Sequence, residues 1–263
     1  MFVVKDILLK LVEGKISVGD AEDEINLLKI REVGSHVKFD ADRESRLGVS
    51  EAVYSQGKSD NDLLNIINNI DFVNNLMITR LDKSRFNRIK NQINKEVLEK
   101  SEYHEDACIL TVNKTEVTQG KGKVGIITAG TADIPIAEEA RITIEQSGYK
   151  TIPTYDVGVA GIHRLVDQIT YLLEEKVDVI ITLAGMEGAL PSVVAGLVNI
   201  PVIAVPTSTG YGVGEKGFLA LFSMLQSCAP GIATMNIDNG YGAGVYAITI
   251  LKQIEKRTKE GYK

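Results

Sequence analysis

Three residues of types that do covalent or acid–base chemistry stand in segments built otherwise from small and apolar residues. Cys228 lies in the segment SCAPG, residues 227–231, between a helix-like run and a strand-like run. Glu187 is the only charged residue of the segment 179–214, and Asp133 follows a short Gly-Thr-Ala sequence. A thiolate can act as a nucleophile and a carboxylate can accept or donate a proton. The residue types therefore permit nucleophilic catalysis assisted by a general base.

Each of these residues also has a structural explanation. A free cysteine is often a small residue of the core. A polar residue just before Pro135 is typical of a helix start, and an isolated carboxylate at a strand end can simply face solvent. Asp238-Asn-Gly is, in the same way, a common tight-turn sequence. The sequence leaves these alternatives open.

From Lys123 onward, apolar runs alternate with amphipathic, helix-like segments. This βαβ alternation predicts a doubly wound α/β fold with a parallel five-stranded sheet. The chain before it is polar and helix-rich, with a short strand expected at Val37–Asp40, which predicts a smaller α+β domain. We expect the N-terminal domain to cover residues 1–118 and the α/β catalytic domain residues 119–263. The five runs are VGIITA, KTIPTY, DVIITLAG, IPVIAVP and GIATMNI.

The loops after these five strands are rich in glycine. In open α/β sheets ligands bind at the carboxyl ends of the strands. Glycines let backbone N–H groups approach a ligand, and helix N-termini favour anions, so a phosphate-bearing ligand is expected. The predicted substrate-binding residues, loop by loop, are Gly130 and Thr131; His163 and Arg164; Gly185, Met186 and Gly188; Ser208; and Asp238, Asn239 and Gly240.

The cysteine pattern and the net charge argue against several classes of binding partner. The two cysteines, Cys108 and Cys228, form no C-x-x-C pattern, which argues against a disulfide framework or structural zinc and favours the cytoplasm. The net charge of −6 argues against nucleic acid or an anionic membrane as a partner. No run reaches the ~18 apolar residues of a membrane span. We expect a small-molecule ligand.

The predicted position of Cys228 is unusual for a catalytic residue. It follows a helix and precedes the fifth strand, so it should lie at the end of the sheet opposite the ligand crevice. If it is catalytic, either its loop wraps around or a neighbouring subunit supplies it. A homo-oligomer with shared sites follows as a hypothesis.

Several motifs of the sequence resemble those of known families. The segments AGMEGALP (184–191), PTSTGYG (206–212), SCAPG (227–231) and NIDNGYGAG (236–244) closely resemble the LarB family, carboxylase/hydrolases of nickel-pincer nucleotide cofactor biosynthesis. Residues 123–256 are also similar to the PurE aminoimidazole ribonucleotide carboxylases and mutases. Upstream, the LarB pattern of Asp-x-x-Arg, Arg-x-Gly and Gly-Lys is matched at Asp40, Arg43, Arg46 and Lys58.

The LarB resemblance implies a reaction on nicotinic acid adenine dinucleotide. Its pyridinium ring would be carboxylated at C5 and its phosphoanhydride hydrolysed, giving pyridinium-3,5-biscarboxylic acid mononucleotide and AMP. CO2 or bicarbonate is the expected co-substrate, with no tightly bound cofactor. Cys228 would bond to the electron-poor ring to make C5 nucleophilic, and Glu187 or Asp133 would remove the C5 proton.

Hydrolysis of a diphosphate usually calls for Mg2+ or basic side chains. Arg43, Arg46, Lys58 and Arg164 are the candidates for the basic groups, and any metal ligands are unknown. The PurE resemblance further implies a homo-oligomer, with octamers as the expected form.

Two other functions stay open. A PurE-like carboxylase or mutase acts on an electron-rich aminoimidazole and needs no thiol. A nucleotide-binding regulator would show no turnover.

Overall fold

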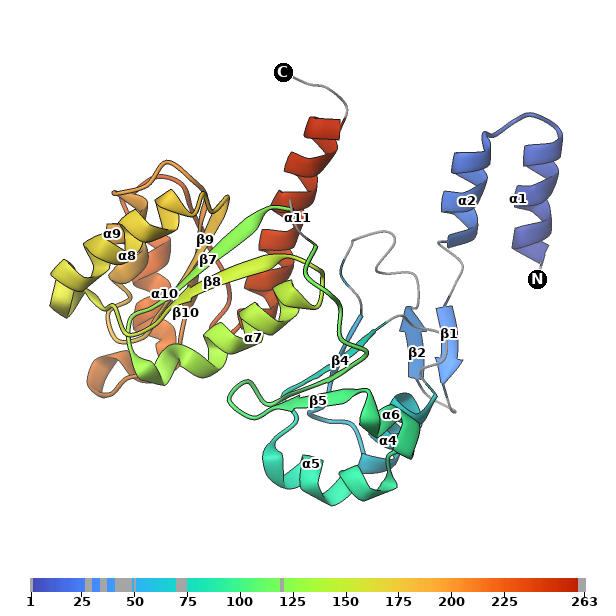
Figure 1. Cartoon of the computed structure of the whole chain (residues 1–263), viewed down its shortest axis with the longest axis horizontal. Helices are drawn as coiled ribbons and strands as arrows, with labels where there is room; N and C mark the ends of the chain where they lie inside the picture. The colour runs from blue at the N-terminus through green and yellow to red at the C-terminus, as the bar shows by residue number, and fades with distance from the viewer. Residues whose placement is uncertain are drawn as a thin grey trace.

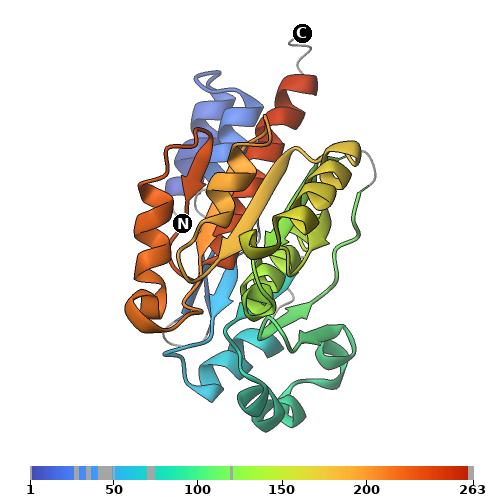
Figure 2. The ribbon, with the colours of Figure 1, turned by 90° about the vertical axis from the view of Figure 1, so that its left-hand side faces the viewer.

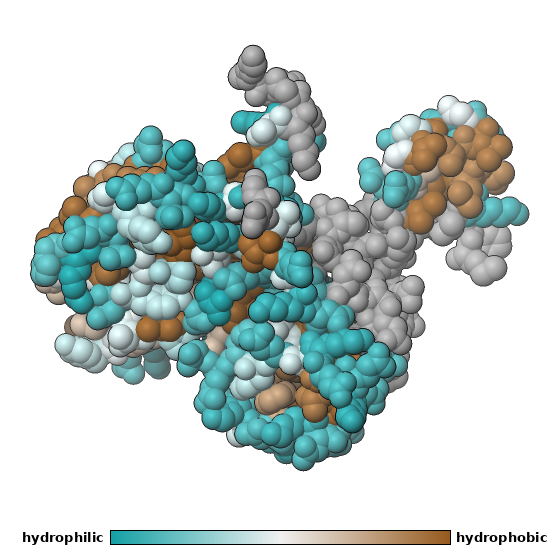
Figure 3. All heavy atoms as spheres, viewed as in Figure 1, coloured by the Kyte–Doolittle hydropathy of each residue, from teal (hydrophilic) through white to brown (hydrophobic). Residues whose placement is uncertain are grey.

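The computed structural model describes residues 2–26, 30–33, 37–40, 49, 51–69, 75–118 and 121–259. It shows two domains and an N-terminal helical hairpin (Figure 1). The hairpin consists of α1 (Phe2–Val12) and α2 (Val18–Asn26), and β1 (Ile30–Val33) and β2 (Val37–Asp40) form an antiparallel ribbon after it. Apolar side chains cover much of the visible face of the hairpin (Figure 3). The short strand expected at 37–40 is confirmed.

The C-terminal domain contains the predicted five-stranded sheet. Its strands are all parallel and lie in the order β11-β10-β9-β7-β8. In chain order this is 2-1-3-4-5, the flavodoxin-like arrangement, with the switch point beside the first strand. The prediction of a doubly wound fold is confirmed. The strands are β7 (Lys123–Thr128), β8 (Lys150–Thr154), β9 (Val179–Ala184), β10 (Val202–Pro206) and β11 (Ile232–Thr234).

Helices cover both faces of this sheet (Figure 2). On one face α7 (Ile134–Glu145) and α11 (Gly240–Lys259) pack over Ile126, Ile181 and Val205. The other face carries α8 (Ile162–Glu174), α9 (Leu190–Ala195) and α10 (Phe218–Leu225). Every residue of β9 is buried, as a central strand between two helical layers requires.

The N-terminal domain is built on a four-stranded mixed sheet of order β3-β4-β6-β5. Its core is formed mainly by leucine and isoleucine side chains from the sheet and from α4. A capping box between Ser59 and Asp62 starts α4. The elements are β3 (Ala52–Tyr54), α4 (Asp60–Asn68), β4 (Leu76–Thr79), α5 (Lys83–Ile89), α6 (Lys95–Glu99), β5 (Ser101–His104) and β6 (Ile109–Val112).

The two domains pack together through α7. Met77 of β4 and Ile109 of β6 form a buried apolar cluster with Ile142 of α7. At the edge of this cluster, Asn75 Nδ2 donates to the carbonyl oxygen of Gln146 at 3.4 Å. The N-terminal sheet thus lies against a helix whose own first turn faces the carboxyl ends of the larger sheet.

The expected fifth glycine loop differs from the prediction. The chain is helical from Gly240 onward, so residues 240–244 belong to α11. A Cβ at Gly240 would lie 2.2 Å from the carbonyl oxygen of Ile136, and one at Gly244 would lie 3.0 Å from Thr143. These glycines allow α11 to pack closely on α7.

Candidate active site

A cavity of about 420 Å³ lies at the carboxyl ends of the central strands. Its wall comes from the loops after β7, β8, β9 and β10, which is where this fold class places its ligands. Five of the predicted site residues line it: Gly130, Asp133, Gly185, Met186 and Glu187.

Asp133 anchors the floor of this cavity. It ends the 3-10 turn Thr131–Asp133, and its side chain is buried. Its carboxylate accepts hydrogen bonds from the Gly130 N–H at 3.0 Å, from Thr207 Oγ1 at 2.6 Å and from Thr209 Oγ1 at 2.7 Å. These bonds join the β7 loop to the β10 loop, so the contacts of Asp133 are those of a positioning residue.

The environment of Glu187 is the opposite of that of Asp133. Its side chain is exposed at the cavity, and no hydrogen bond or ion pair joins it to another residue in the described part of the chain. Its loop is nevertheless fixed, because the Met186 N–H donates to the Thr209 carbonyl at 3.1 Å. A fixed loop carrying an unengaged carboxylate is suited to a general base, which must meet its proton at hydrogen-bond distance.

The backbone of the β9 loop is tightly constrained. Met186 has a φ of 51°, a left-handed value that is uncommon for a residue with a side chain. At Gly185, an added Cβ would lie 2.1 Å from the Thr209 carbonyl oxygen. Asp156 after β8 and Asp238 after β11 also have positive φ values, of 58° and 55°. Such conformations gather at functional sites.

The predicted anion-binding residues at the start of α8 lie outside the cavity wall. His163 and Arg164 are both exposed, and Arg164 forms an ion pair with Asp156 at 3.3 Å. Exposed pairs of this kind contribute at most about 1 kcal/mol, so an anionic ligand can compete for the guanidinium. Thr131 is exposed and lies outside the wall as well.

The predicted residues of the last two loops bind mainly one another. The Ser208 N–H donates to Asp238 Oδ1 at 2.8 Å, and Asn239 Oδ1 accepts from the Gly242 N–H at the start of α11. Asp238 and Asn239 line a second cavity, of about 260 Å³, between the domains. Gly188, like Gly240, is buried: its added Cβ would meet the Ala220 backbone at 2.9 Å.

Cys228 lies at the opposite end of the sheet, as its position in the sequence predicts. It is exposed in the loop between α10 and β11 and is absent from the cavity wall. The neighbouring Ser227 fixes this loop through a 2.8 Å hydrogen bond to Ser192. Six large apolar side chains are exposed in the part of the chain between the two regions, on the segment after β10 and on α10: Tyr211, Val213, Phe218, Leu219, Phe222 and Leu225.

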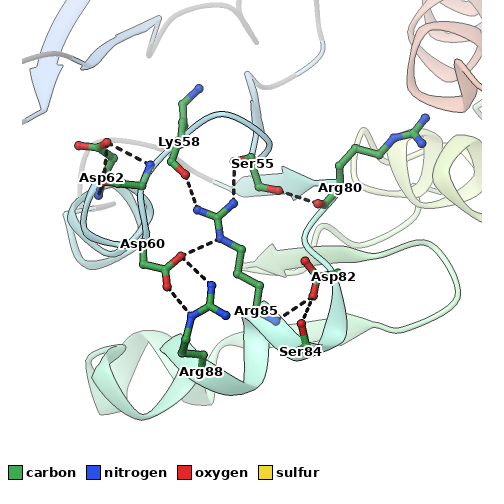
Figure 4. Close-up of polar contacts among 10 residues, drawn as sticks. Ser55, Lys58, Asp60, Asp62, Arg80, Asp82, Ser84, Arg85 and Arg88 are labelled. Atoms are coloured by element: carbon green, nitrogen blue, oxygen red, sulfur yellow. Dashed lines mark hydrogen bonds and ion pairs between the residues drawn. The ribbon is translucent and has the colours of Figure 1, made fainter.

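Of the N-terminal candidates, only Lys58 has a described side chain. It follows Gly57, whose φ of +80° forms a turn, and its carbonyl oxygen accepts from Arg85. Its ammonium group points away from that contact (Figure 4). Only the backbone of Asp40 is described, at the end of β2, and Arg43 and Arg46 lie outside the described residues.

Sequence reasoning missed Thr207 and Thr209, which hold Asp133, and chose Ser208 between them. The sequence offered one signal: neighbouring side chains of an extended segment point to opposite sides, so Thr207 and Thr209 share a side that Ser208 does not. It also missed Arg80 and Glu139, which meet between the domains at 3.2 Å. No spacing rule relates a residue after β4 to one in α7.

Within the described residues, no group of three or more His, Cys, Asp or Glu side chains is arranged to hold a metal ion. In the same residues, no helix has the length and apolar character needed to cross a membrane.

The fold and the cavity define a flavodoxin-like α/β protein with its candidate site at the carboxyl ends of the strands. Residues 123–263 match the AIR carboxylase family model, and residues 30–114 match that of the LarB/PurE-like N-terminal domain. The chain belongs to the AIR carboxylase family and carries a LarB-type N-terminal domain. It is therefore a carboxylase/mutase-type enzyme.

Individual relatives agree with this assignment. An uncharacterized protein of Methanocaldococcus jannaschii is 42% identical over 96% of this chain and 98% of its own length. The N5-carboxyaminoimidazole ribonucleotide mutase of Thermotoga maritima is 32% identical over 52% of this chain and 82% of its own length. The mutase of the same name from M. jannaschii is 37% identical over 48% of this chain and 76% of its own length.

Proposed function

We propose that the protein carboxylates the pyridinium ring of nicotinic acid adenine dinucleotide at C5 and hydrolyses its phosphoanhydride to release AMP. The observation that carries the proposal is the combination of a LarB-type N-terminal domain with an exposed cysteine on the AIR carboxylase domain. An aminoimidazole is already electron-rich, so its carboxylation needs no thiol. A pyridinium ring is electron-poor and does.

The carboxylation proceeds in three steps. The Cys228 thiolate forms a bond to ring C4, and the displaced electron pair moves to the ring nitrogen, giving a dihydropyridine. The enamine carbon C5 then attacks CO2, forming the new carbon–carbon bond. Glu187 removes the C5 proton, and expulsion of the thiolate restores the aromatic cation. Carboxylation thus turns over with release of one proton and no redox change.

The hydrolysis consumes one water. The water attacks one phosphorus, the bridging P–O bond breaks, and AMP leaves with the biscarboxylated mononucleotide as the second product. Arg164, at the start of α8, and the basic residues of the N-terminal domain are the groups proposed to neutralise the diphosphate, with Mg2+ as a further candidate.

A shared site reconciles the positions of the two proposed catalytic residues. Glu187 lines the cavity and Cys228 lies at the other end of the sheet, so one chain does not bring them together. The exposed apolar side chains on α10 support an interface with a second copy, since exposed apolar patches mark contact sites. We propose a homo-oligomer, in octameric form, in which one subunit supplies Cys228 to the cavity of its neighbour.

The deciding experiment incubates the protein with nicotinic acid adenine dinucleotide and 13C-bicarbonate. AMP and a labelled biscarboxylated mononucleotide are expected, and mass spectrometry should find a ring adduct on Cys228. The C228S variant should form neither adduct nor product. If the wild-type protein instead turns over N5-carboxyaminoimidazole ribonucleotide, and C228S does so equally well, the activity is that of the mutases it resembles.

A further inference from the structure

One side chain of the N-terminal domain reaches the loops beside the cavity. The Arg80 guanidinium donates a hydrogen bond to the Asp238 carbonyl oxygen and forms an ion pair with the buried Glu139 of α7 at 3.2 Å. Arg80 and Glu139 both line each of two cavities between the domains. Arg80 therefore joins three elements: the end of β4, the helix α7 and the loop after β11.

The N-terminal domain holds the backbone of Arg80 in an unusual conformation. Its φ is 57°, which costs of order 1–3 kcal/mol for a residue other than glycine. Ser55 fixes it by donating from Oγ to the Arg80 carbonyl at 2.7 Å. Ser55 is held in turn by Arg85, whose guanidinium donates to the Ser55 carbonyl at 2.8 Å and pairs with Asp60.

Figure 4 shows the consequence of this arrangement. Arg85, Arg88 and Asp60 form one polar cluster inside the N-terminal domain, and the Arg80 side chain extends away from it. A strained backbone that is supported from within one domain thus directs its guanidinium to the other domain.

A series of hydrogen bonds leads from Arg80 to Asp133 at the floor of the cavity. Asp238 accepts Arg80 at its carbonyl oxygen, and its carboxylate accepts the Ser208 N–H at 2.8 Å. Thr207 and Thr209, on either side of Ser208, both donate to Asp133. A shift of Asp238 therefore moves the loop that holds Asp133 in place.

We propose that Arg80 is a positioning residue through which the N-terminal domain fixes the segments 207–210 and 236–239 beside the active-site cavity. The proposal that this affects carboxylation rests on the proposed function. The positioning itself is a property of the fold and is measured without any substrate.

Hydrogen–deuterium exchange of the full-length protein tests the positioning. In R80A the amides of 207–210 and 236–239 should exchange about tenfold faster, which corresponds to the loss of about 1.4 kcal/mol of local stability. In R80K, which keeps a charged donor, part of the protection should return. K95A is the control: it removes an exposed cation of the same domain that pairs with Glu99, outside this cluster, and should leave both segments unchanged. Should R80A fail to fold, R80Q replaces it.

Carboxylation assays on the same variants add the functional readout. R80A should lower kcat more than it raises KM, because the geometry of the cavity is disturbed rather than a substrate contact removed. Equal exchange in R80A and the wild type, or faster exchange spread evenly over both domains, overturns the positioning role. A wild-type protein inactive on the dinucleotide overturns the proposed function alone, since the exchange result still decides the role of Arg80.

Discussion

Asp133 and Thr207 are 74 positions apart in the chain, and a 2.6 Å hydrogen bond joins their side chains at the floor of the cavity. Both residues are buried. In the sheet, β9 lies between the strands that precede them, so the bond passes over the end of β9. The loop that leaves β9 at this point carries Glu187. The loops on its two sides, after β7 and after β10, are therefore fixed to each other.

Asp133→Asn should destabilise the fold by about 1–3 kcal/mol, because the amide offers one acceptor oxygen where the carboxylate offers two to its three donors. Thermal denaturation measures the loss. Asp167→Asn, on the exposed face of α8, is the matched control and should leave the melting temperature unchanged. An Asp133→Asn protein as stable as the wild type would show that these hydrogen bonds do not hold the loops.

Glu187→Gln should lower kcat for the proposed carboxylation by roughly 10²–10⁴, the usual contribution of a general base. The stability should stay within about 0.5 kcal/mol, because the side chain is exposed at the cavity and has no described partner. Steady-state kinetics and a melting curve on one preparation separate the two effects. Glu174→Gln, also exposed, should match the wild type in both, and full activity of the Glu187→Gln protein would assign the base elsewhere.

Two inactive variants should restore activity when mixed, if sites are shared between subunits. In a mixed oligomer, a Cys228→Ala subunit keeps its own Glu187 and can receive the thiol from a Glu187→Gln neighbour. Random assortment then restores about a quarter of the sites. The variants are unfolded together, refolded and assayed. If native mass spectrometry finds mixed oligomers and these have no activity, both residues belong to one chain's site.

Gly185→Ala should destabilise the protein by about 1–3 kcal/mol and close part of the cavity, since the added methyl would lie 2.1 Å from the Thr209 carbonyl oxygen. Gly196→Ala is the control, because its methyl would meet no atom closer than 3.5 Å. Denaturant titration compares the two. Equal midpoints would mean that the β9 loop shifts freely, contrary to its observed contacts.

The Glu139 carboxyl should make the stability depend on pH. Burial raises its pKa to about 7, against the opposing influence of Arg80. The folded protein then binds the proton more tightly than the unfolded chain, so Glu139 lowers the unfolding free energy progressively as the pH rises from about 4.5 to about 7. The other titratable side chains that line the two cavities beside it are Tyr54, Asp238 and Tyr241 in one and Asp82, Arg85, Asp106 and Cys108 in the other.

Glu139→Gln should remove this dependence. Its advantage in stability over the wild type should grow by up to roughly 3 kcal/mol between pH 4.5 and 7 and stay constant above that range. Denaturant unfolding across the pH range measures the gap. A gap that does not change with pH would show that Glu139 titrates normally.

The sequence by itself determined the fold of the larger domain. Its five apolar runs are local and periodic, and a parallel sheet buried on both faces permits little else. The same reasoning located the carboxyl ends of the strands as the site and placed Cys228 at the opposite end. Glu187 was visible because a single charge in an apolar segment is a local signal.

Only the tertiary structure decided what those residues contact. Asp133 is held by threonines from the loop after β10, Gly240 packs against α7, and Arg80 meets Glu139 across the domain boundary. These contacts join positions far apart in the chain, and their energies depend on distances that no local pattern encodes. Periodicity fixes which face of an element is buried, but the fold alone decides which polar groups meet there.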